Sequence, residues 1–298
     1  MKLKDSPHPY AIITIFFWSL AYVLTRLSLR CFSAFSLGFL RYFVATCALL
    51  VIAVVTKMRR PKIADYKWFF FAGALGFFLY MIAFNKGCET VTASTSSVII
   101  AIVPIMTALL ARIFYREKLR CFQWIAITVG FIGVTVLTLM KGLFMINTGL
   151  FWLLLAAAAL SAYNLLLRKL TKKYSALQTT TYCIIAGTIL LAVFLPNSVK
   201  EVHRATVPMI LYVAALGIFS SAIAYAAWSQ AFAKAQKTST VSNYMFITPF
   251  LTSLLGFFIA HEKPDLLTFL GGAIILTGLF VFNYGDKIFR KMSRNKRK

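Results

Sequence analysis

The chain is organised around long apolar stretches, each about as long as a helix that crosses a lipid bilayer. Roughly 20 apolar residues in a helix span the hydrocarbon core. Ten such stretches follow one another with short connections, and they are Ser6–Thr25, Phe35–Thr56, Trp68–Asn85, Thr90–Ala111, Cys121–Met140, Gly142–Leu167, Tyr174–Val199, Ala205–Ala233, Thr238–Ala260 and Leu266–Gly285. The sequence therefore predicts an all-α polytopic membrane protein with ten transmembrane helices.

Composition supports this prediction. Of the 298 residues, 60% are hydrophobic and only 13% are charged, against about 25% charged in an ordinary soluble domain. A net charge of +24 is compatible with a nucleic-acid partner. The basic residues lie in short loops between apolar stretches, however, which is typical of cytoplasmic loops. We therefore expect the lipid bilayer as a partner and no nucleic acid.

The distribution of Lys and Arg predicts the orientation. If the N-terminus lies inside, 24 of the 32 basic residues fall on the inner side, seven fall on the outer side, and Arg41 lies within a span. Cytoplasmic loops carry the excess of positive charge, so both termini are expected in the cytoplasm and the protein in the inner (plasma) membrane. The first stretch has no small-residue cleavage site before Arg26, so it is expected to remain as a helix.

The two halves of the chain resemble each other. Gly73 aligns with Gly217 at an offset of 144 residues, and Pro104 aligns with Pro249 at an offset of 145. Each half holds five spans, and because five is odd the second half enters the membrane inverted. The predicted units are a first repeat at 8–141, a second repeat at 146–285, and a basic cytoplasmic tail at 286–298. Further aligned pairs are Ser19 with Ser161, Arg26 with Arg168, and Glu117 with Glu262.

Four motifs carry a family resemblance. They are FFWSLAYVLTR, LGFLRYFVATCALL, ASTSSVIIAIVPIMTALLARIFYREKL and TSTVSNYMFITPFLTSLLGFFIAHEKP. Over about residues 8 to 285 the chain resembles the drug/metabolite transporter superfamily, EamA type. The resemblance implies a fold of two inverted five-helix repeats. It also implies a central cavity lined mainly by the first, third, fourth, sixth, eighth and ninth helices, and movement of small organic solutes, commonly export of amino acids or other metabolites.

Aromatic and amide side chains are the main candidates for lining such a cavity. Residues three or four apart share a helix face, and a few polar groups among aromatic rings are typical of a small-molecule pocket. Tyr and Trp also form belts at membrane interfaces, so the alternative for each of these residues is a place at the interface and not in the cavity wall. The candidates are Trp18, Tyr22, Tyr80, Phe84, Asn164, Tyr225, Trp228, Asn243 and Tyr244.

Arg41 is the one charged residue within a span. Its guanidinium group is suited to bind a substrate carboxylate through two hydrogen bonds. It is also suited to a structural role, snorkelling or bonding helix-end carbonyls, and the resemblance favours the structural role. Cys183 occupies the matching place in the second repeat, so either role is asymmetric.

Catalytic and metal-binding patterns are missing from the sequence. No carboxylate lies within a span, and there is no Gly-rich phosphate loop, HExxH or GxSxG. The five cysteines are widely spaced without a CxxC, so neither a disulfide framework nor a metal site is predicted. We expect no cofactor, no enzymatic activity, and transport by facilitated diffusion or exchange rather than through a proton relay.

The sequence thus predicts a secondary transporter that moves small organic metabolites by alternating access, with export expected. The alternatives are a multidrug or cation exporter and a non-transporting membrane scaffold. A small-molecule substrate is the expected partner. A monomer should be sufficient, because it holds both repeats, and a homodimer stays possible. Pro104 and Pro249 are read either as hinges or as fixed bends, and Glu117 and Glu262 as helix-end ion pairs that gate the path.

Overall fold

The computed structural model describes residues 6–116, 120–139, 148–234, 243–263 and 266–295, and within these ranges it is helical and contains no strand. Seven helical stretches are long and apolar enough to cross a membrane, and three shorter apolar helices, Cys121–Gly133, Ile247–Ala260 and Thr268–Phe282, accompany them. These ten correspond one to one with the ten apolar stretches of the sequence. The prediction of an all-α polytopic fold is confirmed.

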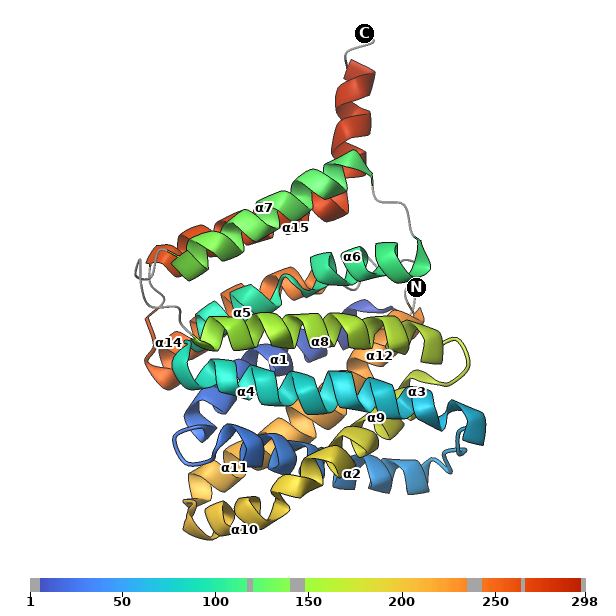
Figure 1. Ribbon diagram of the computed structural model, residues 1–298, viewed down its shortest axis with the longest axis vertical. Coiled ribbons are helices and arrows are strands. Elements are labelled where there is room, and N and C mark those ends of the chain that lie inside the picture. Colours follow the sequence, from blue (N-terminus) through green and yellow to red (C-terminus); the bar gives the residue numbers. More distant parts are fainter. Residues whose placement is uncertain (1–5, 117–119, 140–147, 235–242, 264–265, 296–298) are drawn as a thin grey trace.

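The helices of the first half run mainly along one common direction (Figure 1). They are α1 (His8–Ser28), α2 (Ala34–Val55), the short turn η2 (Ile63–Asp65), α3 (Tyr66–Gly73), η3 (Ala74–Leu79), α4 (Tyr80–Thr90), α5 (Ala93–Ile100), α6 (Val103–Tyr115) and α7 (Cys121–Leu139).

The second half repeats this order. Its elements are α8 (Thr148–Leu170), α9 (Ala176–Leu191), η4 (Ala192–Phe194), α10 (Leu195–Arg204), α11 (Val207–Ala215), η5 (Leu216–Ile223), α12 (Ala224–Lys234), η6 (Asn243–Phe246), α14 (Ile247–Ala260) and α15 (Leu266–Asn295). The last helix continues through Asn295, so the basic segment that follows Gly285 is helical over most of its length.

Matching local devices occur in the two halves. Ser33 caps α2 by accepting a hydrogen bond from the Ser36 amide, and Ser175 caps α9 by accepting one from the Gln178 amide. A serine at this position satisfies an amide that the helix itself leaves without a partner. The third span of each half contains a π-helical turn, η3 in the first and η5 in the second. The internal repeat therefore extends to the caps and to irregular turns.

Two glycines bring the halves into close contact. A Cβ added at Gly73 would lie 2.6 Å from the Ala186 Cβ and 2.8 Å from the Cys183 carbonyl, both on α9. A Cβ added at Gly217 would lie 2.6 Å from the Val44 Cβ and 2.9 Å from the Arg41 carbonyl, both on α2. Arg41 and Cys183 are aligned positions of the two repeats. A glycine of each half therefore packs against the equivalent place in the other half.

The core between the halves is aromatic. Phe77 of η3 is fully buried, and its ring centroid lies 5.3 Å from that of Tyr42, 5.2 Å from that of Tyr163 and 5.4 Å from that of Tyr225. These partners come from α2, α8 and α12, so a single ring contacts both repeats. Edge-to-face packing of this kind adds about 0.5–1.5 kcal/mol per pair beyond area burial.

The helices α7 and α15 stand apart from this core. They pack side by side along one flank of the bundle (Figure 1). They are the fifth and tenth apolar helices of the chain, which agrees with the peripheral place expected for them.

We predict that Gly217→Val lowers the melting temperature of the detergent-purified protein, because the new side chain meets Val44 and the backbone at Arg41. Overpacking of this kind costs about 1–3 kcal/mol. The matched control is Gly256→Ala, where the nearest atom lies 4.0 Å from the added Cβ. Equal melting temperatures for the two variants would contradict the close contact at Gly217.

Candidate functional site

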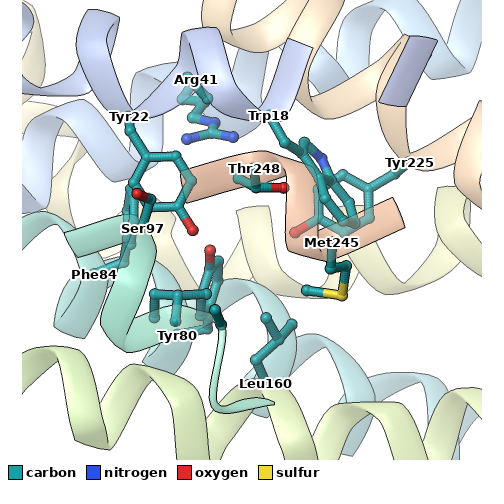
Figure 2. A pocket seen from close by; sticks show the side chains of 13 residues that line it. Trp18, Tyr22, Arg41, Tyr80, Phe84, Ser97, Leu160, Tyr225, Met245 and Thr248 are labelled. Carbon is teal, nitrogen blue, oxygen red and sulfur yellow. The ribbon is translucent and has the colours of Figure 1, made fainter. Parts of the chain in front are cut away.

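A cavity of about 40 Å³ lies at the centre of the bundle, between the two repeats. Side chains from both repeats face it (Figure 2). The lining residues are Trp18, Ala21 and Tyr22 of α1, Arg41 of α2, Tyr80 and Phe84 of α4, Ser97 and Ile100 of α5, Ala101, Leu160 of α8, Tyr225 of α12, Met245 of η6 and Thr248 of α14. These belong to the first, second, third, fourth, sixth, eighth and ninth spans.

Aromatic rings form two walls of the cavity. On one side the Tyr22 and Phe84 ring centroids lie 5.2 Å apart, and Tyr80 stacks on Phe84 at 5.6 Å. On the other side Trp18 packs edge-on against Tyr225 at 5.2 Å. The two walls face each other in Figure 2. Such walls suit a solute with an apolar part, while the phenol and indole groups add polar edges.

Arg41 brings a positive charge to this space. Its side chain is 4% exposed, its Nε donates a hydrogen bond of 2.8 Å to the Ser221 hydroxyl, and its guanidinium group points into the cavity (Figure 2). Within the described residues no carboxylate forms an ion pair with it. Ser221 uses one of the five N–H donors of the guanidinium group, so the arrangement joins α2 to η5 and still leaves donors for an anion.

Thr248 offers a second polar group. Its side chain lines the cavity, and its hydroxyl oxygen is buried without a hydrogen-bond partner in the described part of the chain. A buried hydroxyl without a partner costs free energy, so a ligand atom that bonds it recovers that cost.

The ten predicted site residues separate into two groups. Six of them line the cavity, namely Trp18, Tyr22, Arg41, Tyr80, Phe84 and Tyr225. The other four lie elsewhere. Trp228 packs behind Trp18, with ring centroids 5.0 Å apart. Asn164 donates to the Thr107 hydroxyl at 3.3 Å and so links α8 to α6. The Tyr244 hydroxyl lies 2.7 Å from Nδ1 of His8. Asn243 begins η6, and its side chain lies outside the described residues.

Seven lining residues were not predicted. Ala21, Ile100, Ala101, Leu160 and Met245 are apolar, and in a chain that is 60% hydrophobic nothing distinguishes them from lipid-facing residues. Ser97 and Thr248 are polar residues within apolar spans, and Thr248 directly precedes Pro249, so both could have been found by their chemistry.

Breaks in two spans shape the cavity. The fourth span breaks at Ala101–Ile102, between α5 and α6, and Pro104 lies in the first turn of α6. The ninth span changes from η6 to α14 just before Pro249. The Ser161 hydroxyl lies 2.7 Å from the Ala157 carbonyl of its own helix and 3.2 Å from the carbonyl of Val103, and the Ser19 hydroxyl lies 3.5 Å from the carbonyl of Thr248. Because these carbonyls belong to the residues before the prolines, both bends are held in the same way by the partner repeat.

One end of the bundle is held together by charge. Arg26 Nε lies 3.1 Å from a Glu262 carboxylate oxygen, and the other oxygen accepts a hydrogen bond of 2.9 Å from the Ala93 amide. The same arginine donates to the carbonyls of Cys88 and Glu89. The expected helix-end ion pair of Glu262 is therefore present, and it ties α1, α4, α5 and α14 together. Glu117, its partner in the repeat, lies outside the described residues.

The cavity has space for very few water molecules. Sites for small organic ligands occupy about 300–1,000 Å³, whereas this one measures about 40 Å³. A solute therefore requires the aromatic walls to separate.

Two repeats of five spans with an aromatic-walled cavity between them define a polytopic membrane protein of the transporter class. The model of the "EamA-like transporter family" matches the chain twice, at residues 6–139 and 147–284. The chain belongs to this family, and the fold is its two-repeat, ten-helix fold.

Relatives extend over nearly the whole chain. It is 32% identical over 282 residues to "Uncharacterized transporter YdfC" of Bacillus subtilis, covering 91% of this chain and 90% of that protein. It is 28% identical to a "Probable terminal-alkyne amino-acid exporter" of Streptantibioticus cattleyicolor, covering 91% of each. A crystal structure shares the fold with a TM-score of 0.64 at 18% identity, covering 93% of this chain and 96% of that one.

We predict that Arg26 and Glu262 stabilise the fold jointly. Arg26→Gln and Glu262→Gln should each lower the melting temperature, and the double variant should lower it by less than the sum. Contacting residues in one network couple by about 0.5–3 kcal/mol.

The control is Lys86→Gln. Its ion pair with Glu89 is 2.9 Å long and about one-third exposed on both sides, so its loss should change the melting temperature little. Fully additive effects at Arg26 and Glu262 would show that the two side chains act separately.

Proposed function

We propose that this protein is a secondary transporter for small carboxylate-bearing metabolites, amino acids or related solutes, and that it exports them across the cell membrane by alternating access. The observation that carries this proposal is Arg41, a buried cation with no acidic partner among the described residues, directed into a narrow aromatic cavity. A charge within the membrane that no opposite charge neutralises is costly, and a solute carboxylate would offset that cost through charge-assisted hydrogen bonds.

The aromatic walls and the Thr248 hydroxyl would select the rest of the solute. Rings at Tyr22, Phe84 and Trp18 suit an apolar side chain, and the hydroxyl suits an amine or a second oxygen. The relative from Streptantibioticus cattleyicolor, whose name describes an amino-acid exporter, supports the same class of solute. A cationic drug would meet the like charge of Arg41, which disfavours the multidrug reading.

The inverted repeat supports alternating access. Because the two halves hold each other through equivalent contacts, an inward-open and an outward-open arrangement have similar packing. The distribution of Lys and Arg supports cytoplasmic termini and a location in the cell membrane. Because one chain holds both repeats, we propose that a monomer is the working unit.

The first experiment is a thermal-shift screen of the detergent-purified protein with free amino acids, their carboxamides, nucleobases and lipophilic cations. A ligand that binds the folded state raises the melting temperature by mass action. We expect shifts with one group of free acids and none with the matching carboxamides. Shifts with lipophilic cations alone would overturn the proposal in favour of multidrug export.

Arg41→Gln should weaken binding of the acid found in the screen by about 10- to 100-fold, the equivalent of one charge-assisted hydrogen bond. The melting temperature without ligand should not fall, because the variant removes a buried charge. Ser221→Ala is the matched control, since it removes the tether at Nε and keeps the guanidinium group. Unchanged binding in Arg41→Gln would contradict a carboxylate site.

Leu160→Trp should fill the cavity and abolish counterflow of radiolabelled solute in liposomes. Phe151→Trp on the same helix is the control, because Phe151 is 65% exposed and should tolerate the larger ring. Full counterflow by Leu160→Trp would show that the solute does not pass through this cavity.

A further inference from the structure

A second hollow lies on the outer surface of the bundle, between α3, α6 and α8. It has a volume of about 610 Å³, far more than the central cavity. Its walls are Trp68 and Leu75 on one side, Phe114 on the other, and Ala162, Leu165, Leu166, Arg168, Lys169 and Lys172 along the floor and mouth. We call it the α8 groove.

The α8 groove is separate from the central cavity. Successive residues of a helix are rotated by about 100°, so Ala162, Leu166 and Lys169 lie between about 120° and 180° around α8 from Leu160, which lines the cavity. The groove therefore occupies the opposite face of the same helix. Phe114 at its edge is 70% exposed, as expected for a side chain that faces lipid.

Polarity changes along the groove. The part within the span is apolar, with Leu75, Ala162, Leu165 and Leu166 as walls. The part at the end of α8 is basic, because Arg168 and Lys169 lie in its last turn and Lys172 follows it. An apolar channel that ends in cations matches a phospholipid, which has an acyl chain below a phosphate.

The cation at the mouth is held in place. Lys169 Nζ lies 3.3 Å above the centroid of the Trp68 ring, a cation–π contact, and tryptophan is enriched where spans meet the lipid headgroups. No acidic residue is among the described residues that line the groove. The neighbouring carboxylate, Asp65, is occupied by Lys173 at 3.2 Å and by the Tyr174 hydroxyl at 2.7 Å. The charges of Lys169 and Lys172 therefore stay available for an anion.

We propose that the α8 groove binds one anionic phospholipid of the leaflet that faces the end of α8, with an acyl chain along α8 and the phosphate at Lys169 and Lys172. This inference does not depend on the solute or on transport. A zwitterionic lipid fits the apolar walls equally well but carries a quaternary amine that the basic mouth repels, so the groove should discriminate by headgroup charge.

The test is native mass spectrometry of the detergent-purified protein, titrated with phosphatidylglycerol or phosphatidylcholine of the same chain length. We expect one phosphatidylglycerol to be retained in preference to phosphatidylcholine. The double variant Lys169→Gln/Lys172→Gln should weaken its retention by roughly 10- to 30-fold, the effect of two basic residues at a membrane surface.

The matched control is Lys57→Gln/Arg60→Gln, which removes the same charge from two exposed residues of the loop between α2 and α3. This control should retain phosphatidylglycerol as the parent protein does. An equal loss of phosphatidylglycerol retention in both double variants would mean that lipid binding depends only on the total charge of the protein. That result would overturn the groove as a lipid site.

Ala162→Phe tests the apolar part without changing any charge. A ring at this position narrows the groove, so phosphatidylglycerol retention should fall while the melting temperature in lipid-free detergent stays within a few degrees. Undiminished retention of phosphatidylglycerol would contradict the proposed position of the acyl chain along α8.

Glycerol 1-phosphate and inorganic phosphate are the competitors without acyl chains. Displacement of the lipid by either at equal concentration would show a phosphate site in place of a lipid site.

Discussion

Every polar group that this chain carries into the membrane must find a partner inside the protein, because hydrocarbon offers none. The structure meets this demand mostly between the halves. Arg41 reaches Ser221, Ser161 reaches the carbonyl before Pro104, and the hydroxyls of Thr46 and Thr188 lie 2.8 Å apart. The same bonds that satisfy these groups also join the first repeat to the second. Among the buried hydroxyls without a partner in the described part of the chain, that of Thr248 belongs to a residue that lines the central cavity.

The two halves share one apolar core, and matched contacts also join them on either side of it. Gly73 lies against α9, and Gly217 lies against α2 at the equivalent carbonyl. Ser161 and Ser19, which contact the carbonyls before Pro104 and Pro249, occupy equivalent places in the two repeats as well. Such pairing lets one set of contacts loosen while its counterpart tightens, and Phe77 with its three aromatic neighbours can remain as a common centre.

Most of the fold could be predicted from the sequence, because the length of each apolar stretch is fixed by the bilayer. The repeat followed from Gly73, Pro104 and their counterparts. The cavity was predictable only where chemistry distinguishes a residue, as for Arg41 or Tyr80. Leu160 and Met245 could not be found, since an apolar residue at a cavity looks like one that faces lipid. Trp228 shares a helix face with Tyr225, yet Trp18 stands between it and the cavity, and only the packing of α1 against α12 decides that.

Arg41 has no counterpart in the second repeat, where Cys183 is buried, and this asymmetry has an electrical consequence. A fixed charge within the bilayer experiences the membrane potential, at about 2.3 kcal/mol per elementary charge for each 100 mV crossed. For a carrier that binds a monoanion at this arginine, loading cancels the charge and unloading restores it. With a monoanion, the membrane potential therefore acts only on the return of the empty, positively charged site. With a zwitterionic solute, the site carries the same net charge in the loaded and in the empty carrier. With this single arginine, the net charge of the solute would determine which step of the transport cycle the membrane potential drives.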